Sequence, residues 1–311
     1  MLYREFGKTG FKVSAIGLGT WNIGGQWGAI DDTTAWTTIR KALDCGVTLF
    51  DAAESYGFPY GTSEERLGRA LAGDRHRVRI VTKVGNWGKR EGTPVPKNNP
   101  HMLRLCAHAC LHRLRTDWID TLLCHEGNIE DPSAYLEAFE DLKRTGHILS
   151  YGISTDSLDV LRRFNADGGC SVVQVNYSLL NRAAEAEFLP YCEEHGIAVM
   201  VRGPLAMGLL SGRYSAQTRF EDSVRANWHK DPAKEKQLRE RLAAVDRLKT
   251  FVEPGPAMIR AALQYTISHS SGPVAIPGAK SPAQAELNAS AGERLLDDAE
   301  RGRLLDPLGK C

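Results

Sequence analysis

The sequence has no long hydrophobic run and no excess of charge of either sign, and we expect no secretory leader. Its longest apolar runs, such as residues 197–201, are far shorter than the roughly 20 residues that a membrane-spanning helix requires. Residues 1–6 contain no apolar stretch with a small-residue cleavage site. The 39 Lys plus Arg residues nearly equal the 38 Asp plus Glu residues, which argues against a nucleic-acid or polyanion binder. We therefore expect a cytoplasmic protein that binds neither membranes nor nucleic acid.

The sequence also lacks paired cysteines. Its 7 cysteines are scattered, and no Cys-x-x-Cys pair is available for a zinc ribbon or a thioredoxin-like motif. Reduced thiols are the simplest prediction. The hydrophobic share of 42% and the charged share of 25% are typical of a folded globular protein.

One cluster of Cys and His residues suggests a metal site. Cys106, His108, Cys110 and His112 alternate along a stretch with helical periodicity. At 100° per residue, however, the two cysteines and the two histidines lie on opposite faces. We interpret residues 100–115 as a helix with a core face and a solvated face, and we expect no metal ligands in this chain.

Short apolar runs alternate with amphipathic stretches along nearly the whole chain. The apolar runs lack polar positions on either face, as parallel strands covered by helices do. The predicted strands are residues 15–19, 47–50, 78–81, 119–124, 147–152, 172–175, 197–201 and 273–276. The predicted helices between and after them are residues 33–45, 63–72, 100–115, 133–144, 156–166, 183–195, 256–268 and 281–291.

This alternation predicts an α/β fold with a parallel sheet, either doubly wound or closed into a barrel. A doubly wound dinucleotide domain requires G-x-G-x-x-G after its first strand, and residues 17–22 (GLGTWN) lack the third glycine. Eight units in about 280 residues match a (β/α)8 TIM barrel. We predict one such domain over residues 1–311, beginning with a β-hairpin at residues 2–6 and 12–13.

Two segments interrupt the alternation, and both follow the C-terminal ends of predicted strands. Residues 85–99 are rich in glycine, proline and charge, and residues 212–252 form a polar insertion that is helical from about 234 to 250. Barrel enzymes build their active sites from loops at this end. We therefore expect both segments to border the active site.

Four proton-capable side chains follow three consecutive predicted strands. They are Asp51, Tyr56, Lys83 and His125. A tyrosine is a usable acid near neutral pH only if a neighbouring cation favours its ionised form. Lys83 could supply that charge, with Asp51 holding the ammonium group and His125 directing a carbonyl oxygen toward the phenol. The four together predict an acid catalyst for carbonyl reduction, which also needs a hydride donor.

The chain resembles the aldo-keto reductase superfamily, in its bacterial branch, over nearly its whole length. The resemblance is carried by residues 3–21, 50–71, 80–85, 119–127, 151–155, 173–182, 201–214 and 274–288, including FDAAESYG, VRGPLAMGLLSGRY and VAIPGAKSPAQAELN. It implies that Asp51, Tyr56, Lys83 and His125 are the catalytic tetrad. It also implies an extra C-terminal helix on the outside of the barrel and reduction of an aldehyde or ketone, including a sugar-like carbonyl, with NADPH.

The resemblance further implies an extended nicotinamide cofactor at the barrel mouth. Residues that would hold the carboxamide are Ser154, Thr155 and Gln174, and Gly203, Pro204, Leu205 and Gly208 would receive the pyrophosphate. Gly19, Thr20 and Trp21 would border the cofactor, and Asn288 would contact adenine. Arg202 stands where an aromatic residue commonly stacks on nicotinamide. Because a positive group there should disfavour the oxidised ring, we expect a bias toward NADPH.

The sequence departs from the family pattern where the 2′-phosphate of NADP binds. A lysine and an arginine of better-studied members correspond to Gly278 and Gln284, and Lys280 with Ser281 is the only obvious substitute. One flexible ammonium binds phosphate less selectively than a bidentate guanidinium does. NADP is therefore the expected cofactor, and use of NAD is left open.

Three tryptophans are candidates for the substrate pocket: Trp21, Trp87 and Trp228, of which Trp228 could equally be a packing residue. Three further activities are alternatives. The chain could run the reaction in reverse as an alcohol or sugar dehydrogenase, or act as a weakly catalytic nucleotide sensor. A metal-dependent barrel hydrolase would need histidine or carboxylate clusters at several strand ends, and only His125 qualifies. The substrate and the oligomeric state are not determined by these patterns.

Overall fold

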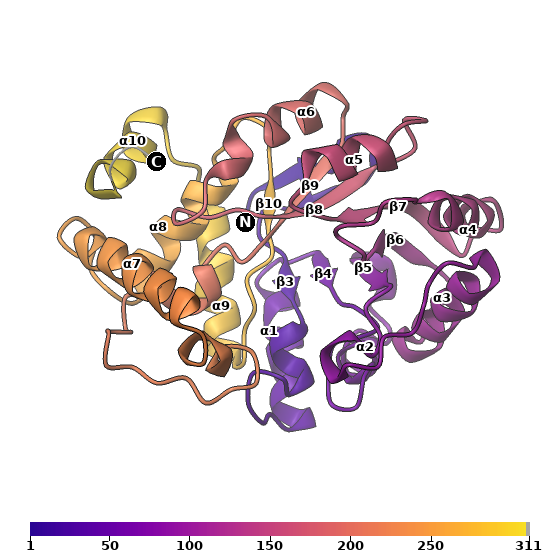
Figure 1. Ribbon diagram of the computed structural model, residues 1–311, viewed down its shortest axis with the longest axis horizontal. Coiled ribbons are helices and arrows are strands. Elements are labelled where there is room, and N and C mark those ends of the chain that lie inside the picture. The colour runs from indigo at the N-terminus through magenta and orange to yellow at the C-terminus, as the bar shows by residue number, and fades with distance from the viewer. Residues whose placement is uncertain (309–311) are drawn as a thin grey trace.

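Eight parallel strands form the centre of the molecule in this computed structural model, which describes residues 1–308 (Figure 1). The strands lie in the sheet in the order of the chain, from β3 to β10, so that each one pairs with the next. The strands are β3 (Leu18–Gly19), β4 (Leu49–Asp51), β5 (Arg79–Val84), β6 (Ile119–Cys124), β7 (Ile148–Ser154), β8 (Val172–Asn176), β9 (Ala198–Arg202) and β10 (Val274–Ala275). All eight predicted strands are thereby confirmed.

The first and last strands meet and close the sheet into a barrel. Parallel bridges join Ile16 to Ala275 and Gly19 to Gly278. The Gly17 amide donates to the Ala275 carbonyl at 2.8 Å. A Cβ atom on Gly19 would lie 2.8 Å from the Ile276 carbonyl oxygen, so the close approach at the seam requires glycine. The closed sheet confirms the barrel and excludes the doubly wound alternative.

Helices surround the barrel where the hydrophobic periodicity predicts them (Figure 1). Those that follow the strands are α1 (Asp32–Asp44), α2 (Thr62–Ala70), α3 (Pro100–Leu114), α4 (Ser133–Arg144), α5 (Leu158–Phe164), α6 (Phe188–Glu194), α8 (Pro256–Ile267) and α9 (Pro282–Ser290). Side chains of Asp31, Asn99 and Ser281 accept backbone N–H groups at helix starts. The helix predicted over 183–195 is instead a short 3-10 turn followed by α6. Pro190 explains this, because it has no N–H and is tolerated only in the first turn.

Two helices lie outside the ring. The insertion after β9 contains α7 (Pro232–Leu248), and α10 (Asp298–Leu305), which follows α9, is the expected extra C-terminal helix. Asp297 and Glu300 form a reciprocal capping box at the start of α10. None of the helices in residues 1–308 is long and apolar enough to cross a membrane.

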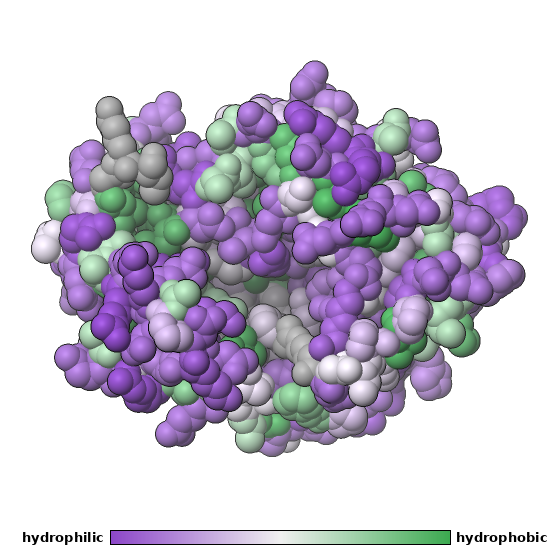
Figure 2. Space-filling view, viewed as in Figure 1, coloured by the Kyte–Doolittle hydropathy of each residue, from purple (hydrophilic) through white to green (hydrophobic). Residues whose placement is uncertain are grey.

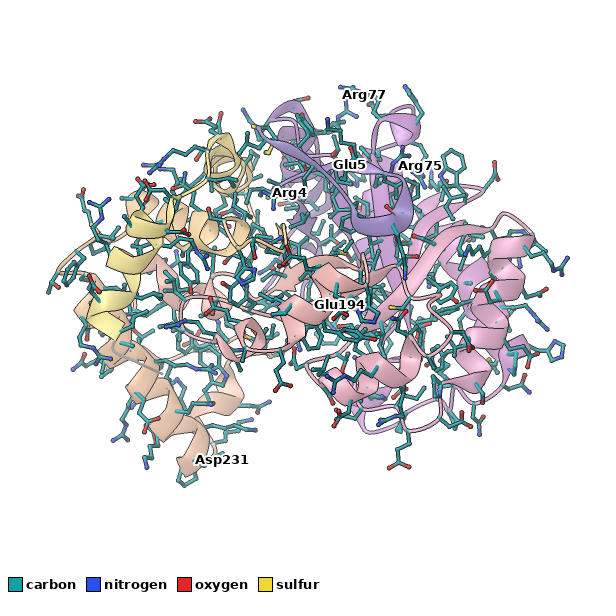
Figure 3. The ribbon with its side chains drawn as sticks, turned by 90° about the horizontal axis from the view of Figure 1, so that it is seen from above. Arg4, Glu5, Arg75, Arg77, Glu194 and Asp231 are labelled. Carbon is teal, nitrogen blue, oxygen red and sulfur yellow. The ribbon has the colours of Figure 1, made fainter. Side chains whose placement is uncertain are left out.

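The barrel interior is plugged at one end by the N-terminal hairpin. Strands β1 (Tyr3–Glu5) and β2 (Lys12–Ser14) pair in antiparallel register and place Phe6 and Val13 inside. These two side chains pack against inward-facing residues of the barrel strands, including Leu49, Val81, Leu123, Met200 and Val274. Figure 3 shows Arg4 and Glu5 of this hairpin at one end of the molecule and Asp231 of the insertion at the other. The hairpin therefore leaves the end with the predicted loops open.

The cysteines and histidines of α3 are divided as the helical spacing predicts. Cys110 is buried and Cys106 half-buried, whereas His108 and His112 are exposed. Among residues 1–308 no group of three or more His, Cys, Asp or Glu side chains is arranged to hold a metal ion. Six cysteines have free thiols, and Cys311 lies outside the described residues.

Candidate active site

The four predicted catalytic residues come together at the open end of the barrel. Asp51 is the last residue of β4, Lys83 lies near the end of β5, and His125 directly follows β6. Because these strands are parallel neighbours, their C-terminal ends share one edge of the barrel. Tyr56 reaches the same place from the segment after β4. We call these four residues the catalytic corner.

Lys83 is the centre of the catalytic corner. Its ammonium group donates to Asp51 Oδ1 at 2.6 Å, to the Ala52 carbonyl at 2.8 Å and to the Tyr56 hydroxyl at 3.2 Å. The Lys83 side chain is 0% exposed and Tyr56 is 7% exposed. The His125 ring lies edge-on to the Tyr56 ring, with their centroids 6.0 Å apart. A phenol hydroxyl thus points at a cation that a carboxylate holds in place.

The charges of this corner stabilise one another against burial. Burial alone would lower the pKa of Lys83, but the Asp51 carboxylate and the Tyr56 hydroxyl together raise it above the ordinary value. Lys83 is therefore a permanent cation in the physiological range. An ammonium beside a phenol favours the phenolate, so the geometry suits a tyrosine that gives up its proton.

The residues expected to hold a carboxamide are joined to this corner. Gln174 on β8 donates from Nε2 to Asp51 Oδ1 at 2.8 Å. Ser154 pairs with Gln174 in the strand register, and the Thr155 amide donates to the Gln174 carbonyl at 3.0 Å. The structure brings these three side chains to the ends of two neighbouring strands.

Thr20 and Trp21 directly follow β3 and contact two residues of the catalytic corner. The Thr20 hydroxyl donates to the Asp51 carbonyl at 2.8 Å. The ring of Trp21 stacks on that of Tyr56, with centroids 5.7 Å apart and planes 20° apart. Trp21 Nε1 donates to Gln26 Oε1 at 2.6 Å, and the same oxygen accepts the Gly57 amide. Gln26 is a buried support that the sequence reasoning missed; a lone glutamine in the Gly- and Trp-rich residues 22–28 is its only signal.

The segment after β9 carries an unusual run of left-handed backbone. Ala206, Met207 and Gly208 have φ values of 47°, 57° and 91°, and Gly203 has φ 66°. Non-glycine residues in this region are strained, and such strain clusters at ligand sites. Successive N–H groups in turns of this kind form concave anion sites. The residues named for a pyrophosphate, Gly203, Pro204, Leu205 and Gly208, lie in or beside this run.

Arg202 at the end of β9 has a partner that the sequence did not reveal. Its guanidinium donates to Asp156, which also accepts the Asn176 amide. The two side chains are 40% and 52% exposed. The positive charge expected beside the nicotinamide is thus partly balanced by a carboxylate.

The segment after β10 carries the residues expected to lie near the adenosine part of the cofactor. The ammonium group of Lys280 donates to the Trp27 carbonyl at 2.8 Å, and the Lys280 amide donates to Gln284 Oε1 at 2.8 Å. Asn288 Nδ2 donates to the Gly278 carbonyl at 3.2 Å. Lys280 is thus bonded to Gln284 and Asn288 to Gly278, and Lys280 is the cation among these four residues.

The three tryptophan candidates divide into two kinds. Trp21 stacks on Tyr56 as described, and Trp87 packs edge-on against Tyr60 at 5.1 Å. Trp228 instead packs against Phe220 at 5.3 Å and joins the hydrophobic core. These contacts give Trp228 a packing role in the insertion. Figure 2 shows a recess near the centre of the face of the molecule seen in Figure 1, bordered largely by hydrophilic side chains.

A closed (β/α)8 barrel with a buried Asp–Lys–Tyr group at its mouth defines an oxidoreductase-type site without a Rossmann motif. Comparison with known proteins agrees with this assignment of an oxidoreductase. Residues 15–305 match the model of the Aldo/keto reductase family. The chain is 33% identical over 295 residues to the aldo-keto reductase YhdN of Bacillus subtilis, covering 92% of this chain and 87% of that one.

Solved structures are similar over the whole length. The holo form of aldo-keto reductase AKR11C1 from Bacillus halodurans has a TM-score of 0.82 at 29% identity, covering 99% of this chain and 96% of that one. An aldo/keto reductase from Klebsiella pneumoniae, in complex with NADP and acetate, has a TM-score of 0.72 at 28% identity, covering 96% and 93%. The chain therefore belongs to the Aldo/keto reductase family and is an oxidoreductase that reduces carbonyl compounds.

Proposed function

We propose that this protein reduces an aldehyde or ketone to an alcohol, with NADPH as the preferred hydride donor and Tyr56 as the proton donor. The observation that carries the proposal is the placement of the Lys83 ammonium between Asp51 and the Tyr56 hydroxyl, at 2.6 and 3.2 Å. This arrangement supports proton donation by a phenol at neutral pH. The domain that performs it is the single barrel of residues 1–311.

The residues at the mouth fit a nicotinamide dinucleotide. The left-handed backbone at residues 206–208 is of the kind that surrounds an anion such as a pyrophosphate, although the Ala206 and Gly208 N–H groups here donate to the Gly203 and Leu205 carbonyls. Gln174 and Ser154 offer amide and hydroxyl groups to a carboxamide. When bound, the reduced cofactor supplies the hydride. The NADP complex of the Klebsiella relative is consistent with this assignment.

The chain's own groups then handle the substrate oxygen. A carbonyl oxygen placed between His125 and the Tyr56 hydroxyl would be polarised by both. Tyr56 would give its proton to the oxygen as negative charge develops there, and the Lys83 ammonium would stabilise the phenolate left behind. Asp51 would keep Lys83 in place. Trp21 and Trp87 would form apolar walls that exclude water from the reacting carbonyl.

The test is a titration of the purified protein with NADPH and with NADH by tryptophan fluorescence, followed by turnover of a panel of aldehydes and ketones. We expect tighter binding of NADPH than of NADH, and carbonyl-dependent oxidation of NADPH. Binding without turnover on any substrate would favour the nucleotide-sensing alternative. Binding of neither cofactor would contradict the proposal.

A further inference from the structure

A lysine, a cysteine and a glutamate meet behind the loop of residues 85–99, which we call the substrate loop. In its second half the side chains at 96, 98 and 99 are exposed, whereas Lys97 is 8% exposed. The Lys97 ammonium lies 2.8 Å from Cys106 Sγ on α3 and 3.8 Å from Glu54 Oε1. None of these three groups takes part in the proposed reaction.

The burial of Lys97 is unusual for a loop residue. A buried ammonium is tolerated when it has charged or polar partners, and here Glu54 and Cys106 are those partners. Glu54 is 1% exposed, lies two residues before Tyr56 and accepts the Gly85 amide at 2.7 Å. The group therefore joins the substrate loop, α3 and the segment that carries Tyr56.

We propose that Lys97 and Cys106 form a modification site, at which a peroxide converts their contact into a covalent sulfur–nitrogen cross-link. In the first step peroxide oxidises the Cys106 thiol to a sulfenic acid: an S–O bond forms, the O–O bond breaks, the sulfur gives up two electrons and one water leaves. In the second step the Lys97 amine attacks that sulfur, the S–N bond forms, the S–O bond breaks and a second water leaves. Relative to the reduced protein, the pair has lost two hydrogens.

The surroundings act on the two steps in opposite directions: burial raises the pKa of the Cys106 thiol and slows the first step, whereas a carboxylate beside Lys97 assists the second. Cys106 is half-buried and is therefore more open to peroxide than Cys110, Cys124, Cys170 and Cys192, which are buried. Lys97 must lose a proton before it attacks, and the Glu54 carboxylate is next to it. Burial raises the pKa of Glu54 above the ordinary value, despite the opposing effect of Lys97, which makes it a better proton acceptor than an exposed carboxylate.

The cross-link would change the mouth of the barrel. It would fix residue 97 of the substrate loop to α3 and remove the positive partner of Glu54. Trp87 lies in the same loop, so the side of the pocket that it borders would have less freedom to move when a substrate binds. This consequence, unlike the cross-link itself, rests on the proposed function, and we expect it as a change in KM larger than that in kcat.

The chemistry is tested on the full chain by peptide mass spectrometry after treatment with hydrogen peroxide. Because burial raises the pKa of the Cys106 thiol, the thiolate is scarce and the peroxide should be in excess. We expect a linked pair of peptides containing Lys97 and Cys106, short of two hydrogens and released by a thiol reductant. Cys45 is the internal control, because it is half-buried too and no lysine donates to its sulfur among the described residues. Oxidation of Cys106 to sulfinic or sulfonic acid without a link would overturn the proposal.

Two variants keep the test independent of folding and of carbonyl reduction. Lys97→Arg retains the positive charge but offers a poor nucleophile, so its Cys106 should stop at the sulfenic acid and be trapped by a dione reagent. Cys106→Ser should retain basal activity and lose the effect of peroxide on KM. If both variants respond to peroxide as the wild type does, the site is not the one proposed. The mass measurement decides this even if no carbonyl is reduced.

Discussion

The two ends of the cofactor site are built in different ways. At the catalytic corner the Lys83 ammonium is fully buried and has three acceptors within 3.2 Å. At the proposed adenosine end the Lys280 ammonium is partly exposed and has one acceptor among the described residues, the Trp27 carbonyl. We infer that the proposed chemistry depends on buried, mutually fixed groups, and we propose that the choice between NADP and NAD depends on the single, more exposed cation of Lys280.

Replacing Lys83 with Met should have the largest effect, because it should lower both the free energy of unfolding and the turnover. It leaves the Asp51 carboxylate buried without its cation, which costs about 3–5 kcal/mol of the free energy of unfolding. Turnover should fall with it, because the phenolate of Tyr56 loses its stabilising charge. Denaturant unfolding measures the first effect and steady-state kinetics the second. Lys89→Met, which removes a more exposed lysine paired with Glu126, is the control and should cost under about 1 kcal/mol.

Replacing Lys280 with Met should act on cofactor choice alone. Loss of one charge-assisted bond to the 2′-phosphate weakens NADPH binding by about 1.5 kcal/mol, roughly tenfold in Kd, and leaves NADH binding unchanged. Fluorescence titration with both cofactors measures this. An equal loss for NADPH and NADH would show that Lys280 supports the loop around Trp27 rather than the phosphate.

Replacing Asp156 with Asn should have a smaller effect, at the nicotinamide end. Without the carboxylate the Arg202 charge is less balanced, so NADP+ should bind more weakly relative to NADPH by about two- to fivefold, the range of an exposed ion pair. The ratio of the two Kd values is the measurement. Asp159→Asn removes the exposed partner of Arg162 on α5 and serves as the control. An unchanged ratio would show that Arg202 does not discriminate between NADP+ and NADPH.

Changing the pH between about 7 and 10 should have the smallest effect of all on the stability that Lys83 contributes. The pKa of Lys83 in the folded protein is raised above the ordinary value of about 10.5. A group with a raised pKa contributes stability that is fully present below the unfolded pKa and is lost as pH rises through the folded pKa. We therefore expect no loss of stability from Lys83 until pH exceeds about 10.5, and none of this alkaline loss in Lys83→Met. Thermal unfolding from about pH 7 to above pH 10.5 tests it, and a loss that begins below about pH 9 in the wild type alone would contradict it.

The parts that could be predicted from the sequence are those governed by periodicity and strand ends. The eight strands were predictable because their residues are apolar on both faces, and Asp51, Lys83 and His125 because each follows an apolar run. The break before α6 could be predicted only from Pro190. The helical periodicity of residues 183–195 outweighed that single signal.

The contacts between distant segments could not be predicted. The pairing of Asp156 with Arg202 and of Lys97 with Glu54 depends on how loops from different strands meet, and no local pattern encodes that. Gln26 supports Trp21 and Gly57 from a turn whose composition predicts only flexibility. For Trp228 the pattern left packing and substrate contact equally open, and its contacts with Phe220 favour packing.

The proposed reaction depends above all on Tyr56, which donates the proton and does not bind the cofactor. The most direct measurement compares Tyr56→Phe with the wild type, with the Kd for NADPH and kcat determined on the same preparations. We predict an unchanged Kd and a kcat that is lower by roughly a hundred- to ten-thousand-fold, because a general acid acts in the transition state. A variant that turns over at nearly the wild-type rate would contradict the account.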